Sequence, residues 1–155
     1  MRYTLLICLL ALCFMACNKD KYTTAPQISF KSFNPAQGSN QNNSSNAPTL
    51  IIEATDAEGD LGLVQGKDTA KVFIKNMLTL KEDSLDFPDL QSAGKSNFKA
   101  DVEVSLFSVL GGRNLPVSAR PFADTLHFQV YIRDFAKNKS NVLITDQPFI
   151  FYTLP

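Results

Sequence analysis

The acidic side chains of Asp56, Glu58 and Asp60 stand at alternate positions and are the strongest candidates for chemistry in this chain. In a tight loop, carboxylates with this spacing can converge on one cation, and Ca²⁺ takes roughly six to eight oxygen ligands. The spacing matches the opening of an EF-hand loop, but the sixth and twelfth positions are Leu61 and Lys67, where that loop needs Gly and Glu. The turn therefore predicts either a loop capped by its own aspartates, which is the preferred interpretation, or a weak Ca²⁺ site.

His127 is the only histidine, and it limits the catalytic chemistry that the chain can perform. A Ser–His–Asp set needs a histidine within hydrogen-bond reach of a nucleophile, and no G-x-S-x-G pattern marks an activated serine. One histidine also cannot form a typical zinc site without cysteines or further histidines. We therefore expect His127 to be a surface residue. For the protein as a whole, we expect no catalytic residues, no resident cofactor and no enzyme activity. A small hydrolase that uses two carboxylates in a loop cleft is the alternative.

A second candidate site is the polar face of the segment that contains Tyr131 and Arg133. These two residues share that face with His127 and Gln129. Tyr and Arg are enriched in binding hot spots, so the face is a candidate for binding a protein or a glycan. The absence of tryptophan argues mildly against a platform dedicated to sugars, and an ordinary solvated sheet face is the alternative.

Two long alternating segments must position these residues. Apolar and polar residues alternate along Lys99–Phe107 and Thr125–Arg133, which is typical of half-buried antiparallel strands. The alternation predicts two core-facing rows of side chains: Val102, Val104 and Leu106 on the first strand, and Phe128, Val130 and Ile132 on the second.

The remaining segments predict an all-β protein. The expected further strands are Gln27–Phe33, Thr49–Thr55, Ala70–Met77, Asn141–Thr145 and Pro148–Thr153, with a polar loop over Pro35–Pro48. No segment predicts a convincing amphipathic helix, because Pro88 interrupts the best candidate, Leu78–Leu90. About seven short strands separated by Gly, Pro, Asn and Ser favour an antiparallel β-sandwich of the immunoglobulin-like type.

The N-terminus has the features of an export signal. Residues 5–16 carry no charge and follow Arg2, and such a run is shorter than the roughly 20 residues that a membrane-spanning helix needs. The run ends in Phe14-Met15-Ala16-Cys17, which resembles the lipobox of bacterial lipoproteins, with Phe14 where Leu is usual. The resemblance implies a signal peptide over 1–16, a lipid on Cys17, a flexible tether over 17–26 and a β-sandwich domain over 27–155. It also implies a membrane as the partner of that lipid.

The positions of the cysteines and the balance of charge limit the remaining classes of function. Cys8 and Cys13 lie within the expected signal peptide and Cys17 at its end, so the mature chain is expected to have no free thiol. Lysine plus arginine and aspartate plus glutamate number 15 each, without a basic stripe, so no nucleic-acid partner is expected. Asn18 permits export to an outer membrane, and Lys19-Asp20 resembles the surface-export signals of Bacteroidota lipoproteins.

Two further segments carry a resemblance to known proteins. Residues 56–62 resemble the "DGDGDIG"-like turn of small Bacteroidota lipoproteins, and residues 131–141 are similar to the "V-x-D-x-A-G-N-x-S" corner of bacterial immunoglobulin-like modules, with Lys137 where Gly is usual. Asp134 is expected to cap its own turn with Asn138; the alternative is that it adds a ligand to the Ca²⁺ site if the two loops meet. The resemblance implies a noncatalytic immunoglobulin-like module, for binding or for structure, on a cell envelope. It supplies no catalytic residues.

Overall fold

The computed structural model describes residues 22–61, 69–87 and 96–155, and these residues form an all-β protein. They contain ten strands and the short 3-10 helix η2 (Val117–Ala119). The strands are β1 (Gln27–Asn34), β2 (Gln37–Ser39), β3 (Thr49–Asp56), β4 (Lys71–Asn76), β5 (Glu82–Asp86), β6 (Phe98–Ser105), β7 (Phe122–Leu126), β8 (Phe128–Arg133), β9 (Leu143–Ile144) and β10 (Phe149–Thr153). The all-β prediction is therefore confirmed, while the expected count of about seven strands is too low.

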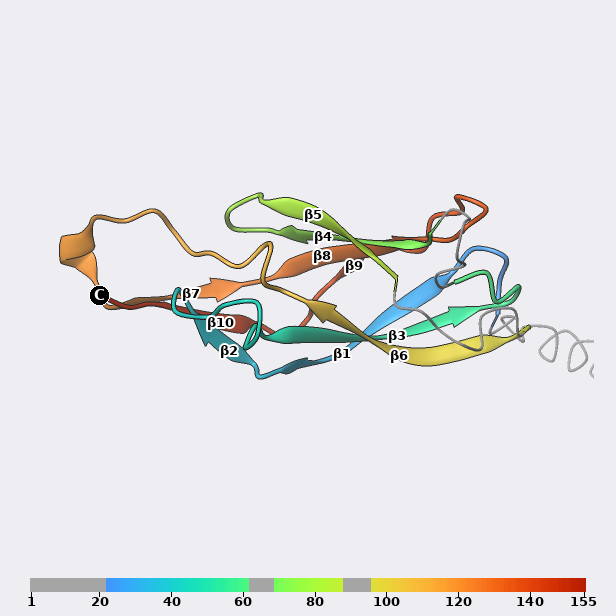
Figure 1. Ribbon diagram of the computed structural model, residues 1–155, viewed down its shortest axis with the longest axis horizontal. Coiled ribbons are helices and arrows are strands. Elements are labelled where there is room, and N and C mark those ends of the chain that lie inside the picture. Colours follow the sequence, from blue (N-terminus) through green and yellow to red (C-terminus); the bar gives the residue numbers. More distant parts are fainter. Residues whose placement is uncertain (1–21, 62–68, 88–95) are drawn as a thin grey trace, which may run out of the picture.

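The strands form three sheets. Their orders are β1-β3-β6, β5-β4-β8-β9 and β2-β10-β7, and all pairs are antiparallel except the parallel pair β2–β10. In Figure 1, strands β4, β5 and β8 lie over strands β1, β3 and β6, and the third sheet extends the molecule toward its C-terminal end. The protein therefore has two main layers, with the third sheet at one end.

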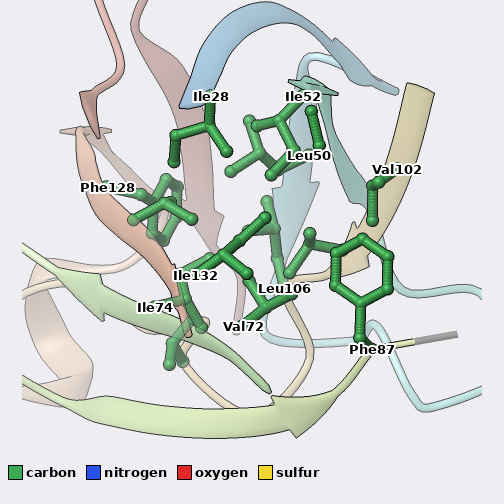
Figure 2. Packing of buried hydrophobic residues seen from close by; sticks show 14 of the residues in the cluster. Ile28, Leu50, Ile52, Val72, Ile74, Phe87, Val102, Leu106, Phe128 and Ile132 are labelled. Carbon is green, nitrogen blue, oxygen red and sulfur yellow. The ribbon is translucent and has the colours of Figure 1, made fainter. Parts of the chain in front are cut away.

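The core lies between these two layers and confirms the register of the two clearest strands. Val102 and Val104 are 2% exposed, and Leu106, Phe128, Val130 and Ile132 are completely buried. Figure 2 shows Val102 and Leu106 from one layer and Val72, Ile74 and Ile132 from the other pointing into the same apolar interior. Burial of each such side chain stabilises the fold by about 1.5–3 kcal/mol.

The expected long strand over Thr125–Arg133 is interrupted at His127. Strand β7 pairs with β10, whereas β8 pairs with β4 and β9, so the chain passes from one sheet to another at this residue. His127 is half-buried and its Nδ1 lies 2.8 Å from the carbonyl oxygen of Thr145. His127 is thus at the surface but only partly exposed, because the sheet change brings it against the start of the β9–β10 connection.

Sequence patterns missed two strands. Strand β2 lies within Pro35–Pro48, the segment that was expected to be a polar loop. Strand β5 was missed as well. It occupies part of Leu78–Leu90 and pairs with β4, with Ser84 opposite Phe73. The connecting turn is organised by Asn76, which is completely buried and whose side chain makes four hydrogen bonds. This β4–β5 hairpin forms one edge of the sheet that carries Tyr131 and Arg133.

The last part of the expected tether packs on the domain. Residues 17–21 lie outside the described residues, but Pro26 is buried and the backbone N–H of Ala57 donates to the carbonyl oxygen of Thr23 over 3.2 Å. Residues 23–26 of the expected tether therefore contact the domain, and the acidic turn lies beside them.

Candidate functional site

Asp56 is the last residue of β3, and its side chain organises the acidic turn. It is completely buried, and its Oδ2 accepts hydrogen bonds from the backbone N–H groups of Gly59 at 2.6 Å and Asp60 at 3.1 Å. Gly59 has a φ of 71°, which a glycine adopts without steric cost. The preferred interpretation, a loop capped by its own aspartate, is therefore confirmed.

A third acidic residue joins this turn from the other end of the chain. Strand β8 ends just before Asp134, which is 1% exposed, and the next backbone N–H, that of Phe135, donates to the carbonyl oxygen of Asp60 over 3.3 Å. Asp134 also accepts hydrogen bonds from the backbone N–H and side-chain amide of Asn138, at 2.7 and 2.9 Å. The predicted cap of that turn is thus confirmed, and the acidic cluster consists of Asp56, Asp60 and Asp134.

Glu58 does not belong to this cluster, because its side chain is exposed to solvent. One oxygen each of Asp56 and Asp60, the Oδ1 atoms, is buried without a hydrogen-bond partner among the described residues. Burial, as the largest cause, and the negative charges of Asp134 and Asp56 together raise the pKa of Asp60 to about 6. The acidic cluster therefore favours the protonated form of the Asp60 carboxyl group.

The Ca²⁺ expectation for Asp56, Glu58 and Asp60 gains no geometric support. Within the described ranges, no three His, Cys, Asp or Glu side chains form a group that could hold a metal ion. Weak Ca²⁺ binding stays a prediction.

The second predicted site, Tyr131 and Arg133, lies on the outer face of β8. Tyr131 pairs across the strands with Phe73 of β4, and their rings stack with centroids 4.7 Å apart and planes 6° apart. The guanidinium carbon of Arg133 lies 5.7 Å from the Phe73 ring centre, and Nζ of Lys139 lies 4.0 Å from the Tyr131 ring centre. Cations in these positions are attracted by the negative faces of aromatic rings. We call Phe73, Tyr131, Arg133 and Lys139 the aromatic face.

A groove of about 420 Å³ adjoins the aromatic face on the side of β5. Phe73 and Tyr131 line it together with the polar side chains of Lys75, Glu82, Ser84 and Gln129. Ser84 stands opposite Phe73 in the strand pairing, and we attribute the open space beside the ring to this short side chain. The groove falls in the size range of small-molecule sites, which is roughly 300–1,000 Å³.

Phe73 is the functional residue that the sequence did not single out. It lies between two buried neighbours, Val72 and Ile74, and the run of three apolar residues made it a candidate for the core. The alternation of β4 places it on the outer face instead. Its partnership with Tyr131 depends on the pairing of β4 with β8, which no local pattern reveals.

No protein-family model, curated protein or solved structure matches this chain. The described residues also contain no helix that is long and apolar enough to cross a membrane. The expected signal peptide and Cys17 lie outside the described residues.

Proposed function

We propose that this chain is a lipid-anchored, noncatalytic binding module of a bacterial cell envelope, with an immunoglobulin-like sandwich as its scaffold. The aromatic face and its adjoining groove form the docking surface. The observation that carries the proposal is the stacked pair Phe73–Tyr131, which is only partly buried and is flanked by Arg133 and Lys139.

Aromatic and arginine side chains, such as Tyr131 and Arg133, are enriched in binding hot spots. The two rings are already stacked in the unbound protein, so little conformational entropy is lost when a partner docks on them. Lys75 and Glu82 pair at 3.4 Å along one side of the groove, and Gln129 adds a side-chain amide. These polar groups supply hydrogen bonds that fix the orientation of a ligand.

The anchor is proposed from the sequence of residues 14–17. A lipid on Cys17 holds the domain at a membrane surface, and Asn18 with Lys19-Asp20 favours the outer membrane, with exposure at the cell surface. A binding module in this location meets envelope proteins, glycans and material outside the cell.

Carboxylate-based hydrolysis is the second candidate, and the raised pKa of Asp60 is the observation that favours it. The burial of Asp56 argues against it, because substrate needs access to both carboxylates. The hollow that Asp134 lines is shared with Lys71, Arg133 and Lys137, not with Asp56 or Asp60. The binding module is therefore the better-supported function.

The test is sedimentation of the full chain, in detergent micelles, with insoluble cell-envelope material of its native host. Replacement of both Phe73 and Tyr131 by Leu keeps apolar bulk but removes the flat rings, and we expect it to abolish co-sedimentation. Tyr152→Leu is the matched control, because Tyr152 is exposed on the separate sheet β2-β10-β7. Equal co-sedimentation of the double variant and the control would contradict the proposed docking surface.

A further inference from the structure

A second hollow of about 230 Å³ lies on the other side of Phe73 along β4. Lys71, Arg133 and Lys137 are among the residues that line it. The groove described above is lined instead by Lys75 and Gln129, which lie on the opposite side of Phe73 along the two strands. The Phe73 ring is therefore shared by two adjacent hollows. The first groove contains the Lys75–Glu82 ion pair, the carboxylate of Asp83 and neutral polar groups, and the second hollow is rich in cations.

The charges around the second hollow are positive in balance. Lys71 forms an ion pair with Asp86 at 2.6 Å, but Arg133 forms no ion pair with a carboxylate in the part of the chain that the structure describes. The one carboxylate in the lining, Asp134, is 1% exposed and already accepts hydrogen bonds from Asn138. An anion that enters this hollow meets exposed cations and a carboxylate that is withdrawn from solvent.

The position of Arg133 suits recognition of an anion. Its guanidinium carbon lies 5.7 Å from the Phe73 ring centre, and a planar guanidinium carries its N–H donors around its edge. Those donors form the fork that binds a carboxylate or sulfate through two hydrogen bonds. Arg133 thus links the aromatic surface to an anion-binding position.

We propose that the aromatic face binds an anionic glycan, an inference that rests on the proposed binding function. A sugar ring lies against Phe73 in the larger groove, where Ser84, Glu82 and Gln129 meet its hydroxyl groups. The carboxylate or sulfate group of the same or the next sugar lies in the second hollow, where Arg133 and Lys71 neutralise it.

The test measures binding of three tetrasaccharides to the full chain in detergent micelles by thermophoresis. The probes are tetragalacturonate, which carries carboxylates, a chondroitin sulfate tetrasaccharide, which also carries sulfates, and the neutral maltotetraose. We expect one or both anionic probes to bind, with an affinity that falls as salt is added. Tighter binding of one of the two anionic probes shows whether the site prefers a carboxylate or a sulfate group. Equal binding of maltotetraose, or no binding of any probe, would overturn the inference.

Arg133→Glu is expected to weaken binding of the anionic probe by about tenfold or more, since it replaces an attraction by a repulsion. Lys99→Glu is the matched control: it makes the same change of charge on sheet β1-β3-β6, where Lys99 pairs with Glu53 at 2.8 Å. An equal loss in both variants would show a nonspecific charge effect and overturn the inference. If no probe binds while the Phe73/Tyr131 double variant still loses co-sedimentation with envelopes, the docking surface stands and only its glycan ligand is wrong.

Discussion

Phe73 and Tyr131 stack against each other from neighbouring strands with nearly parallel rings, and they do so on the outer face of their sheet. Cross-strand aromatic pairs contribute about 0.5–1.5 kcal/mol beyond the area that they bury. We therefore expect a double-mutant cycle of Phe73→Ala and Tyr131→Ala to give a coupling energy in that range. The measurement is urea unfolding of the four proteins, and additive losses of stability would contradict the stacked geometry.

Asp60 makes a prediction about the pH dependence of stability. Its pKa of about 6 in the folded protein lies above its ordinary value of 3.8, because burial and neighbouring carboxylates disfavour the charged form. The stabilisation that this gives is complete below about pH 4 and is lost as the pH rises through about 6. Asp60→Asn stays uncharged, so we expect it to be more stable than the wild type at pH 7 by about 1–2 kcal/mol, after allowance for solvent screening.

The measurement for Asp60 is thermal unfolding of wild type and variant at pH 4 and pH 7. Asp146→Asn removes the same charge from an exposed turn and serves as the control. A gain at pH 7 that is equally large at pH 4, or equally large in the control, would show that ionisation of Asp60 is not its cause.

Asn76 is a second buried polar residue whose role can be tested. Its amide nitrogen donates to the carbonyl oxygens of Val109 and Gly111, both at 3.0 Å, and its Oδ1 accepts the backbone N–H of Leu78 at 2.9 Å. Asn76→Asp places a carboxylate against two carbonyl oxygens, so we expect a loss of at least about 2 kcal/mol at pH 7 in chemical unfolding. Asn114→Asp, at an exposed position, should cost little, and a similar loss in both variants would refute the explanation.

Gly112 is constrained by a buried carboxylate. A Cβ at this position would lie 2.2 Å from Oδ2 of Asp124 and 3.1 Å from the Phe151 ring, and Asp124 also holds the backbone N–H of Arg113 at 2.8 Å. Gly112→Ala is therefore expected to cost about 1–3 kcal/mol in the wild type. The cost should shrink in an Asp124→Ala background, where the clash is relieved. An unchanged cost would place the strain in the backbone of Gly112 itself.

Cys17 tests the anchor that is proposed from the sequence. Cys17→Ala removes the sulfur to which the lipid is attached, and we expect the protein to move from the membrane fraction to the soluble fraction after cell lysis. Mass spectrometry of the wild-type N-terminal peptide should show the added acyl mass. Membrane association that persists in the variant would contradict lipid anchoring.

Local patterns predicted the strands in which apolar and polar residues alternate without interruption. The rows Val102/Val104/Leu106 and Phe128/Val130/Ile132 are buried as expected, because a half-buried strand must show its core face at every second residue. Strand β5 escaped because only Leu85 of its five residues is apolar, so it has no row of apolar side chains to reveal it. The break at His127 escaped because the chain changes sheets without breaking the alternation.

The candidate sites depend on contacts between distant parts of the chain, and this limited their prediction. Asp56 and Asp60 are close in sequence and their turn was predicted, but Asp134 reaches it only through the packing of the β8 turn. Glu58 was grouped with them by spacing alone, and the capped turn directs it to solvent. Tyr131 and Arg133 were identified by type, whereas Phe73 required the register of β4 against β8.

In the proposed lipid-anchored form, the hydrogen bond between Thr23 and Ala57 limits the tether between the lipid and the domain to residues 17–23. The chain from Cys17 to Thr23 spans at most about 20 Å when fully extended. In the proposed lipid-anchored form, this short span would keep the acidic turn near the membrane, while η2 and the C-terminus lie at the opposite end of the body (Figure 1). The proposed docking surface on β4 and β8 lies between these two ends, so a partner of the anchored protein would bind at the side of the body.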